Sequence, residues 1–378
     1  MKKILIVTND YPSKYNIYAN AFVHARAVCY VNEFEVRVLV CKKNVDNIMQ
    51  YVYDGVSVQV VSDRSMILAH IKSYSPNVIA IHFVSAWMLD IFIRKVSCPI
   101  FIWIHGVEAL GWYRRLFNFN ILHIKEFLAY IKNNTLQLWG LRKIISYSNR
   151  NKKVQFVFVS KWMKRITEFD TGIKIKYECI IPNPIDSDLF KYSCKDVELR
   201  KRILLIRPFE SRKYANDVAI NAILELSKRP FFQDLEFFIY GKGRLFEPLT
   251  SKIKGFNNVT VINSYIEHKL IPEIHKLCGI FLCPTRQDAQ GVSMCEAMSS
   301  GLVVVTSNNT AIPEFVEDNV TGILTHNSIE IADKIEYLYY HADVFQRISR
   351  NAASQIRKIA GHEYIISQEV SLLSSKIE

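Results

Sequence analysis

The segment TRQDAQGVSMCEAMSSG, residues 285–301, places Asp288 and Glu296 around a turn from a strand into a helix. Gly291 and Val292 open that helix, where free backbone N–H groups attract an anion such as phosphate. A carboxylate near the second helical turn repels phosphate, so Glu296 is suited to accept hydrogen bonds from hydroxyl groups. Phosphate and hydroxyls together indicate a nucleotide sugar. The alternative is a capped helix with an incidental surface carboxylate.

A second group of candidate residues is cationic. Arg207, Arg212 and Lys213 fall in the loop that follows the strand expected at RILLIR. Cations at the end of a strand can hold a diphosphate without a metal ion and neutralise it as a leaving group. The alternative is a solvated basic loop, but the position directly after a sheet strand favours a binding site.

Two further segments place a glycine or a histidine after a strand. YGKGRLFEPL offers Gly241 for a tight turn that touches a nucleotide, but it lacks the third glycine of a dinucleotide fingerprint, so NAD is not expected. WIHGVEALGW places His105 after a strand, with Gly106 and Glu108 close by. This histidine can hydrogen-bond a sugar hydroxyl or relay a proton, and the alternative is a structural role.

The composition indicates a folded protein with reduced cysteines. Of 378 residues, 49% are hydrophobic and 22% charged, which suits two or three domains and argues against disorder. The eight cysteines form no CxxC pair, so we expect free thiols in a cytoplasmic protein and no metal site. The start, MKKILIVTNDYP, does not fit a secretory signal, and no apolar run is long enough to span a membrane.

Short strands and helices alternate through both halves of the chain. The first half has expected strands at 2–8, 35–40, 56–61, 77–83, 99–105, 155–160 and 178–183. The second half has them at 202–207, 236–241, 259–263, 279–285 and 302–307, followed by a helical tail. Val- and Ile-rich runs separated by helices predict an α/β protein with parallel sheets covered on both faces. The expected fold is therefore two Rossmann-like, doubly wound domains that face a cleft.

The same pattern predicts the domain boundaries. We expect an N-terminal domain at 1–184, a linker at 185–200 and a nucleotide-sugar-binding domain at 201–360. A C-terminal helix at 361–378 is expected to pack back on the N-terminal domain.

The segment 111–153 stands apart by its charge. It carries nine Lys or Arg against one acidic residue, Glu126, and so supplies +8 of the net charge of +12. Aromatic residues are interleaved with these cations: Trp112, Tyr113, Phe117, Phe127, Tyr130 and Trp139. Such helices lie in an anionic membrane interface, which is the partner we expect. Nucleic acid is the rival that we do not expect, and an ordinary insertion with a solvated basic face is a third alternative.

Taken together, these segments resemble the retaining glycosyltransferases of family 4, which have the glycosyltransferase-B (GT-B) fold. Residues 284–324 are similar throughout to the family's Glu-x7-Glu region, including its EAM helix and its PE-x-V-x-D-x-x-TG turn. FVSKWM and IPNPID resemble the family's strand-ending serine and its approach to the linker. HG-x-E at 105–108 resembles the acceptor-side motif.

This resemblance implies roles for the candidate residues. Glu296 corresponds to the carboxylate that binds the donor's ribose, and Asp288 stands where the family has its first Glu, facing the sugar. Arg207 and Lys213 correspond to the basic pair on the diphosphate, although the preceding arginine competes for the lysine's role. His105 would lie near the reacting sugar.

The implied reaction moves a sugar from a UDP- or GDP-sugar to a lipid-linked or polysaccharide acceptor, with retained anomeric configuration and no metal or other cofactor. The departing phosphate accepts the acceptor's proton, so the cations become the central catalysts. The expected setting is bacterial cell-surface polysaccharide synthesis, on the inner face of the cytoplasmic membrane. Two alternatives stay open: a sugar-nucleotide epimerase of the same fold, and a non-catalytic, membrane-docked partner subunit.

Overall fold

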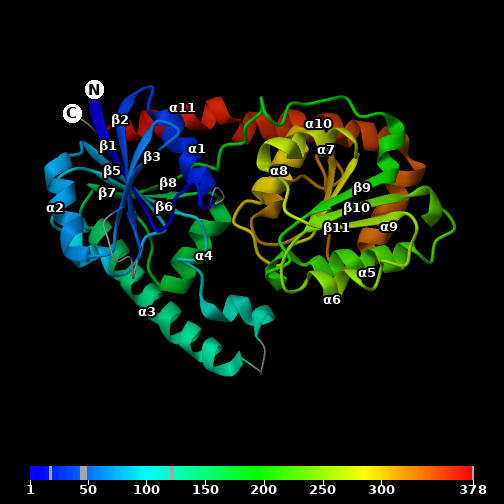
Figure 1. Ribbon diagram of the computed structural model, residues 1–378, viewed down its shortest axis with the longest axis horizontal. Coiled ribbons are helices and arrows are strands. Elements are labelled where there is room, and N and C mark those ends of the chain that lie inside the picture. Colours follow the sequence, from blue (N-terminus) through cyan, green and yellow to red (C-terminus); the bar gives the residue numbers. More distant parts are fainter. Residues whose placement is uncertain (17–18, 43–48, 120–122, 377–378) are drawn as a thin grey trace. The chain divides into compact units, whose positions relative to one another are not determined.

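The computed structural model describes residues 1–16, 19–42, 49–119 and 123–376, and the chain forms two compact units (Figure 1). Unit 1 is Met1–Asn183 with Ile365–Glu378, and unit 2 is Pro184–Tyr364. Residues 185–200, expected as a linker, therefore fall within unit 2. Residues 120–122 of the basic segment and 377–378 at the C-terminus lie outside the described residues.

Unit 1 is built on a sheet in the order β3-β4-β2-β1-β5-β6-β7-β8. Its neighbouring strands are parallel except for β3, which runs antiparallel to β4 at the edge. The central strands β5 and β6 are buried along their whole length, as continuous apolar runs in a parallel sheet should be. The strands are β1 (Lys2–Thr8), β2 (Phe34–Cys41), β3 (Met49–Tyr53), β4 (Val56–Val61), β5 (Val78–His82), β6 (Ile100–Ile104), β7 (Val154–Phe158) and β8 (Glu178–Ile180).

Helices cover both faces of this sheet. Side chains of α1 and α11 contribute to the core on one face, while α2, α3 and α4 lie on the other (Figure 1). The helices are α1 (Ala21–Tyr30), α2 (Arg64–Tyr74), α3 (Ile124–Ser148), α4 (Lys161–Thr171) and α11 (His362–Ser374), with the short helices η1 (Leu89–Ile93) and η2 (Trp112–Asn118).

A buried ion pair fixes α11 to α1. The Arg26 guanidinium donates from Nε to Glu369 at 2.9 Å, and both side chains are fully buried. Tyr30 donates to the other oxygen of Glu369 at 2.6 Å, and Arg26 Nη2 donates to Asn183 at 2.9 Å. The chain passes between the units after Asn183 and again before Ile365. Within unit 1, Arg26 therefore bonds one residue close to each crossing, Asn183 and Glu369.

Unit 2 has an all-parallel sheet in the order β11-β10-β9-β12-β13-β14. Helices α5 and α9 pack together on one face, and α8 lies on the other beside α10 (Figure 1). The strands are β9 (Arg202–Ile206), β10 (Glu236–Gly241), β11 (Val259–Asn263), β12 (Ile280–Cys283), β13 (Val303–Ser307) and β14 (Ile323–Thr325). The helices are α5 (Asn216–Leu226), α6 (Phe246–Thr250), α7 (Ile271–Lys276), α8 (Val292–Ser299), α9 (Ser328–Tyr340) and α10 (Ala342–Ala360), with five short helices η4 (Val197–Lys201), η5 (Arg212–Tyr214), η6 (Phe232–Asp234), η7 (His268–Leu270) and η8 (Ile312–Glu314).

The predicted α/β class with two doubly wound sheets is confirmed. The sequence pattern did not predict the edge strands β3 and β14, and the helical tail is divided at His341 into α9 and α10. No helix among the described residues is long and apolar enough to cross a membrane.

Candidate functional site

The strand order of unit 2 predicts where a ligand binds. β9 lies between β10 and β12, so the chain leaves β9 toward one side of the sheet and returns to the other side at β12. Loops at such a switch point diverge and leave a crevice at the carboxyl ends of the strands. Arg207 directly follows β9, and the loop from Asp288 to Gly291 follows β12.

Arg207 and Lys213 lie around one aromatic ring. The Arg207 guanidinium is 5.8 Å and the Lys213 ammonium 4.9 Å from the centroid of the Tyr214 ring. Arg207 is only 4% exposed, donates from Nη2 to the Cys283 carbonyl at 3.2 Å, and has a buried Nε with no partner in the described part of the chain. Arg212 is exposed. The geometry therefore groups Lys213, and not Arg212, with Arg207.

The turn that carries Lys213 is tied to the loop after β12. The Lys213 carbonyl accepts from the Arg286 N–H at 2.8 Å and from the Thr285 hydroxyl at 3.2 Å. Arg286 in turn makes two hydrogen bonds of 2.7 Å to Asp217 at the start of α5. These contacts hold the loops after β9 and β12 together, so the turn that carries Lys213 has a fixed place beside the loop that leads into α8.

Asp288 shapes the loop that enters α8. Its Oδ1 accepts from the N–H groups of Gly291 at 2.8 Å and of Gln290 at 3.3 Å, while no described residue bonds its Oδ2. Gly291 has a φ of +82°, in the left-handed region that favours glycine. No described side chain caps α8, so the N–H groups of its first turn, beginning at Val292, can bind an anion.

Glu296 has a partner that the sequence pattern did not reveal. His268, in η7 after β11, lies 2.7 Å from Glu296 Oε1 through its Nε2. The hydrogen bond to Glu296 raises the pKa of His268. Glu296 itself is 8% exposed, and its carboxylate is therefore oriented by His268. The segment around His268 carries no motif, and the two residues, which are 28 positions apart, meet only in the folded unit.

Gly241 ends β10, and packing explains why it is a glycine. A Cβ at this position would lie 2.2 Å from the Arg207 carbonyl oxygen and 2.5 Å from the Phe209 ring. The loop after β9 thus fills the space that a side chain would need. This close approach accounts for the glycine without a nucleotide.

His105 belongs to unit 1, directly after β6. Its Nε2 lies 2.9 Å from Nδ1 of His82, and burial together with the charge of Arg26 holds the pKa of His105 well below its usual range. Glu108 accepts from the N–H groups of His105 at 2.6 Å and Gly106 at 3.0 Å, and burial raises its pKa to about 6. The loop backbone and the imidazole ring are therefore both held in place.

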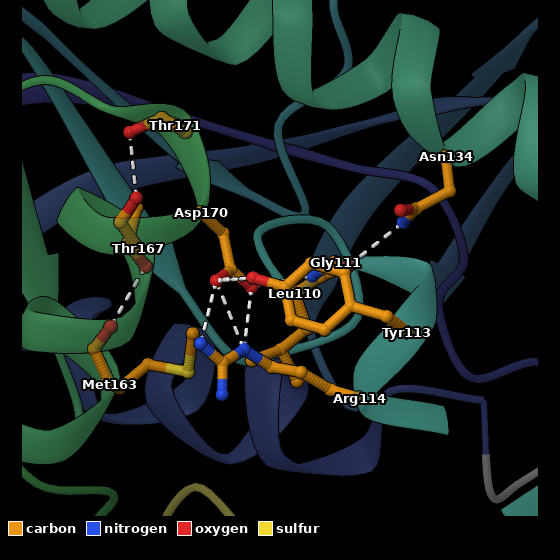
Figure 2. Close-up of polar contacts among 9 residues, drawn as sticks. All are labelled: Leu110, Gly111, Tyr113, Arg114, Asn134, Met163, Thr167, Asp170 and Thr171. Atoms are coloured by element: carbon orange, nitrogen blue, oxygen red, sulfur yellow. Dashed lines mark hydrogen bonds and ion pairs between the residues drawn. The ribbon is translucent and has the colours of Figure 1, made fainter. Parts of the chain in front are cut away.

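The basic segment is anchored on a buried carboxylate (Figure 2). Asp170 of α4 accepts from the Gly111 N–H, the Tyr113 hydroxyl and the Arg114 guanidinium at 2.6–3.0 Å. Asn134 of α3 donates to the Leu110 carbonyl at 2.9 Å. Arg114 therefore has a structural partner and is not a free surface cation.

The outer face of the basic segment is apolar as well as basic. Ile124, Leu128, Leu136 and Trp139 recur at three-, four- and eight-residue spacing along α3, and each is 47–58% exposed. In η2 and just after it, Leu116 and Phe119 are exposed too, as are the lysines at 125, 132 and 143. Several of the aromatics that we expected on the surface, including those at 112, 127 and 130, instead contact one another on the inner side.

Metal ligands are not grouped in the described residues: no three His, Cys, Asp or Glu side chains are placed to hold an ion together.

Comparison with known proteins bears on unit 2 and on the fold. Residues 200–341 match the family model for glycosyl transferases group 1. The chain is 28% identical over 138 residues to an alpha-D-kanosaminyltransferase of Streptomyces kanamyceticus, covering 35% of each protein. It is 24% identical over 271 residues to the GtfA subunit of a UDP-N-acetylglucosamine–peptide N-acetylglucosaminyltransferase of Streptococcus agalactiae, covering 63% of this chain and 52% of that protein. The chain thus spans about a third to a half of these relatives' lengths.

Solved structures extend the likeness to both units. Sucrose-phosphate synthase from Thermosynechococcus elongatus superposes with a TM-score of 0.74 at 13% identity, over 99% of both chains. The Anabaena protein HepE, in complex with UDP and glucose, superposes with a TM-score of 0.70 at 17% identity, over 99% of this chain and 100% of that one. These comparisons identify the chain as a protein of the GT-B glycosyltransferase fold, whose second unit carries the match to glycosyl transferases group 1.

Proposed function

We propose that this protein is a retaining glycosyltransferase of family 4 that transfers a sugar from a nucleoside-diphosphate sugar. One observation carries the proposal. Arg207 and Lys213 share the Tyr214 ring in the loop after β9, and the uncapped start of α8 follows the neighbouring strand β12. Two cations and a set of free N–H groups suit a diphosphate.

The roles of the other residues follow from this placement. The diphosphate binds Arg207, Lys213 and the N–H groups at Val292. Glu296, oriented by His268 at 2.7 Å, accepts hydrogen bonds from the ribose hydroxyls. The unpartnered Nε of Arg207 supplies one donor for a phosphate oxygen.

Charge stabilisation is then the main source of catalysis. Negative charge grows on the β-phosphate as the bond to the sugar breaks, and the two cations stabilise it more in the transition state than in the bound donor. Because these cations neutralise the leaving group, we propose that no metal ion is required. Asp288 contributes by shaping the loop at Gly291 with Oδ1 and by offering Oδ2 to the sugar.

Proteins of the same fold support a nucleotide-sugar donor. HepE was solved with UDP, with UDP and glucose, and with UDP-glucose, and TarM of S. aureus with UDP and α-GlcNAc-glycerol. We infer a UDP- or GDP-sugar donor for this chain, and a lipid-linked or polysaccharide acceptor of the kind used in bacterial cell-surface synthesis.

The activity is tested with a panel of UDP- and GDP-sugars in excess chelator, with and without lipid-linked and oligosaccharide acceptors, and the product's anomeric configuration is read by NMR. Transfer with retention supports the proposal. A product with inverted anomeric configuration contradicts the retaining mechanism. Loss of activity on chelation contradicts the metal-free mechanism. Isomerisation or hydrolysis of the donor without an acceptor indicates the epimerase, and binding without turnover indicates the partner subunit.

The exposed face of α3 favours an anionic membrane as the surface on which the acceptor is met. Ile124, Leu128, Leu136 and Trp139 form an apolar stripe, and no described residue forms an ion pair with Lys125 or Lys132 beside it. Leucine and tryptophan at the headgroup level with lysines beside them are typical of helices that lie in a membrane interface. The positive charge complements the headgroups of anionic lipids.

Vesicle co-sedimentation tests this surface. Wild-type protein should bind anionic vesicles more than neutral ones, and binding should fall with salt because the attraction is screened within about 10 Å at 0.1 M. Leu136→Ser/Trp139→Ser should lose most binding even at low salt. The matched control is Leu277→Ser in unit 2, which alters a side chain of similar exposure, 58%, and should bind as wild type. Equal loss in the control, or tighter binding to RNA than to vesicles, would contradict membrane docking.

A further inference from the structure

A second histidine stands behind His105. His82 is the last residue of β5 and is fully buried, and its Nδ1 lies 2.9 Å from Nε2 of His105. The ring planes are 14° apart and the centroids 5.2 Å apart, so the two rings lie edge to edge in nearly one plane. His82 also stacks on the buried Trp103 ring, with the two ring centroids 5.0 Å apart. The position of His82 is therefore fixed by packing, and His105 is hydrogen-bonded to a rigid group.

Two phenylalanines confine the His105 ring further. Phe22 of α1 meets it edge-on at 4.8 Å, and Phe83 lies 4.9 Å away. Phe83 has a φ of +63°, a left-handed conformation that is strained for a bulky residue. Strain of this kind persists only where the surroundings enforce it, and it is concentrated at functional sites. Here it turns the chain after His82 so that the Phe83 ring lies against His105.

The hydrogen bond between the rings leaves only one nitrogen of His105 for a ligand. Burial lowers the pKa of both histidines well below the usual range, each further lowered by the charge of Arg26 and that of His82 also by His105, which favours the neutral form of both rings. One ring must donate and the other accept. His82 Nε2 is buried and has no partner among the described residues. Orphaned buried N–H groups are rarer than unfilled acceptors, which favours a proton on His82 Nδ1 and an accepting Nε2 on His105.

The proton of His105 then lies on Nδ1. His105 is partly exposed, and no described residue bonds its Nδ1. We propose that His82 is a positioning residue, which holds the ring and the tautomer of His105 so that Nδ1–H is offered as a neutral donor to a sugar oxygen of the substrate. This inference rests on the proposed function for the identity of the substrate. The inferred tautomer favours hydrogen bonding over proton relay as the role of His105, because the accepting nitrogen of His105 is already bonded to His82.

The tautomer is measured directly, without turnover. Two-bond 1H–15N NMR of protein labelled with 15N-histidine distinguishes protonated from unprotonated ring nitrogens, and the His105→Asn spectrum identifies the His105 signals. We expect the proton on Nδ1 in the wild type and a mixture of tautomers in His82→Leu. A wild-type His105 protonated on Nε2 would overturn the inference whatever the activity.

Kinetics test the consequence for the reaction. A misplaced contact costs on the order of 10- to 100-fold, so His82→Leu should lower kcat/KM by about that factor while UDP or GDP affinity, a property of unit 2, is unchanged. His82→Asn places an amide near the position of Nδ1 and should restore part of the loss. Unchanged turnover in His82→Leu, or no difference between the two variants, contradicts a positioning role. If the wild type shows the Nδ1–H tautomer but transfers no sugar, the proposed function fails and the assignment of the histidine pair stands.

Discussion

Tyr214 determines which basic side chain of its loop belongs to the candidate site. Its ring lies beside the Arg207 guanidinium and the Lys213 ammonium, while Arg212 is exposed. The resemblance to family 4 does not decide whether Arg212 or Lys213 has the role of the family's lysine, because the two residues are adjacent in the sequence. The aromatic contact separates them, since cations gain from the face of a ring only when they lie within about 6 Å of it.

Arg207→Ala and Lys213→Ala should each lower turnover on the order of 100-fold while weakening donor binding less, because charge grows on the phosphate in the transition state. Arg212→Ala is the matched control and should lose little. Steady-state kinetics with the identified donor measure both parameters. If Arg207→Ala and Lys213→Ala changed only KM, the two cations would hold the donor and take no part in its cleavage.

The pair of His268 and Glu296 gives unit 2 a dependence of stability on pH. The pKa of His268 is raised in the fold by Glu296, so the protonated form is favoured in the folded state. Its contribution is full below the ordinary histidine value of about 6.5 and is lost as pH rises through the raised pKa. His268 is half-exposed, which limits the effect to about 1 kcal/mol or less.

His268→Asn should therefore lower Tm at about pH 5.5 more than at about pH 9, where the pair no longer contributes. Thermal unfolding at both pH values measures these two changes in Tm. Glu296→Gln removes the partner carboxylate, so it should also lower Tm more at about pH 5.5 than at about pH 9. An equal change in Tm at both pH values would show that the ion pair is not the cause.

At the scale of elements, Asp170 connects α4 to the segment that leads into α3. Its side chain is fully buried, while that of its partner Arg114 is 23% exposed. Asp170→Ala leaves the cation without its partner, and we expect a loss of about 3 kcal/mol in the free energy of unfolding. Urea denaturation measures the loss, and limited trypsin digestion should cut near Arg114 and Arg115 sooner. Asp170→Ala/Arg114→Leu should recover part of the stability, and full additivity of the two changes would contradict a coupled pair.

Elements were predicted well where local composition decides them and poorly where tertiary contacts do. The central strands, such as β5 and β6, are continuous apolar runs that only a parallel strand buried on both faces explains. The edge strand β3 has an exposed, mixed pattern and exists because it pairs with β4, so its sequence carries little signal. The candidate residues Arg207 and Gly291 could be proposed from the sequence because each follows a strand, and their roles stay predictions. His268 and His82 were missed because their partners are far away in sequence.

At the scale of the whole molecule, α11 brings the end of the chain back to unit 1, and the ion pair between Arg26 and Glu369 holds it there. Arg26 and Glu369 are separated by 343 residues, and both are fully buried. Arg26→Leu leaves the buried Glu369 carboxylate with the Tyr30 hydroxyl as its one donor in the part of the chain that the structure describes, and should cost about 3–5 kcal/mol. Arg26→Met/Glu369→Leu replaces the pair with apolar side chains and should be close to wild type. Chemical denaturation measures both variants, and a single mutant as stable as the wild type would show that α11 is held by its apolar contacts alone.

The central claim is that unit 2 binds a nucleoside diphosphate through Arg207, Lys213, Glu296 and the start of α8. The most direct measurement is calorimetric titration of the full-length protein with UDP and with GDP in excess chelator, followed by thermal unfolding at saturating nucleotide. We predict that one of the two nucleotides binds at a single site, and that at about 100 times its Kd it stabilises the protein by roughly 2.7 kcal/mol. Absence of binding by either nucleotide, or binding that Arg207→Ala and Glu296→Gln leave unchanged, would contradict the account.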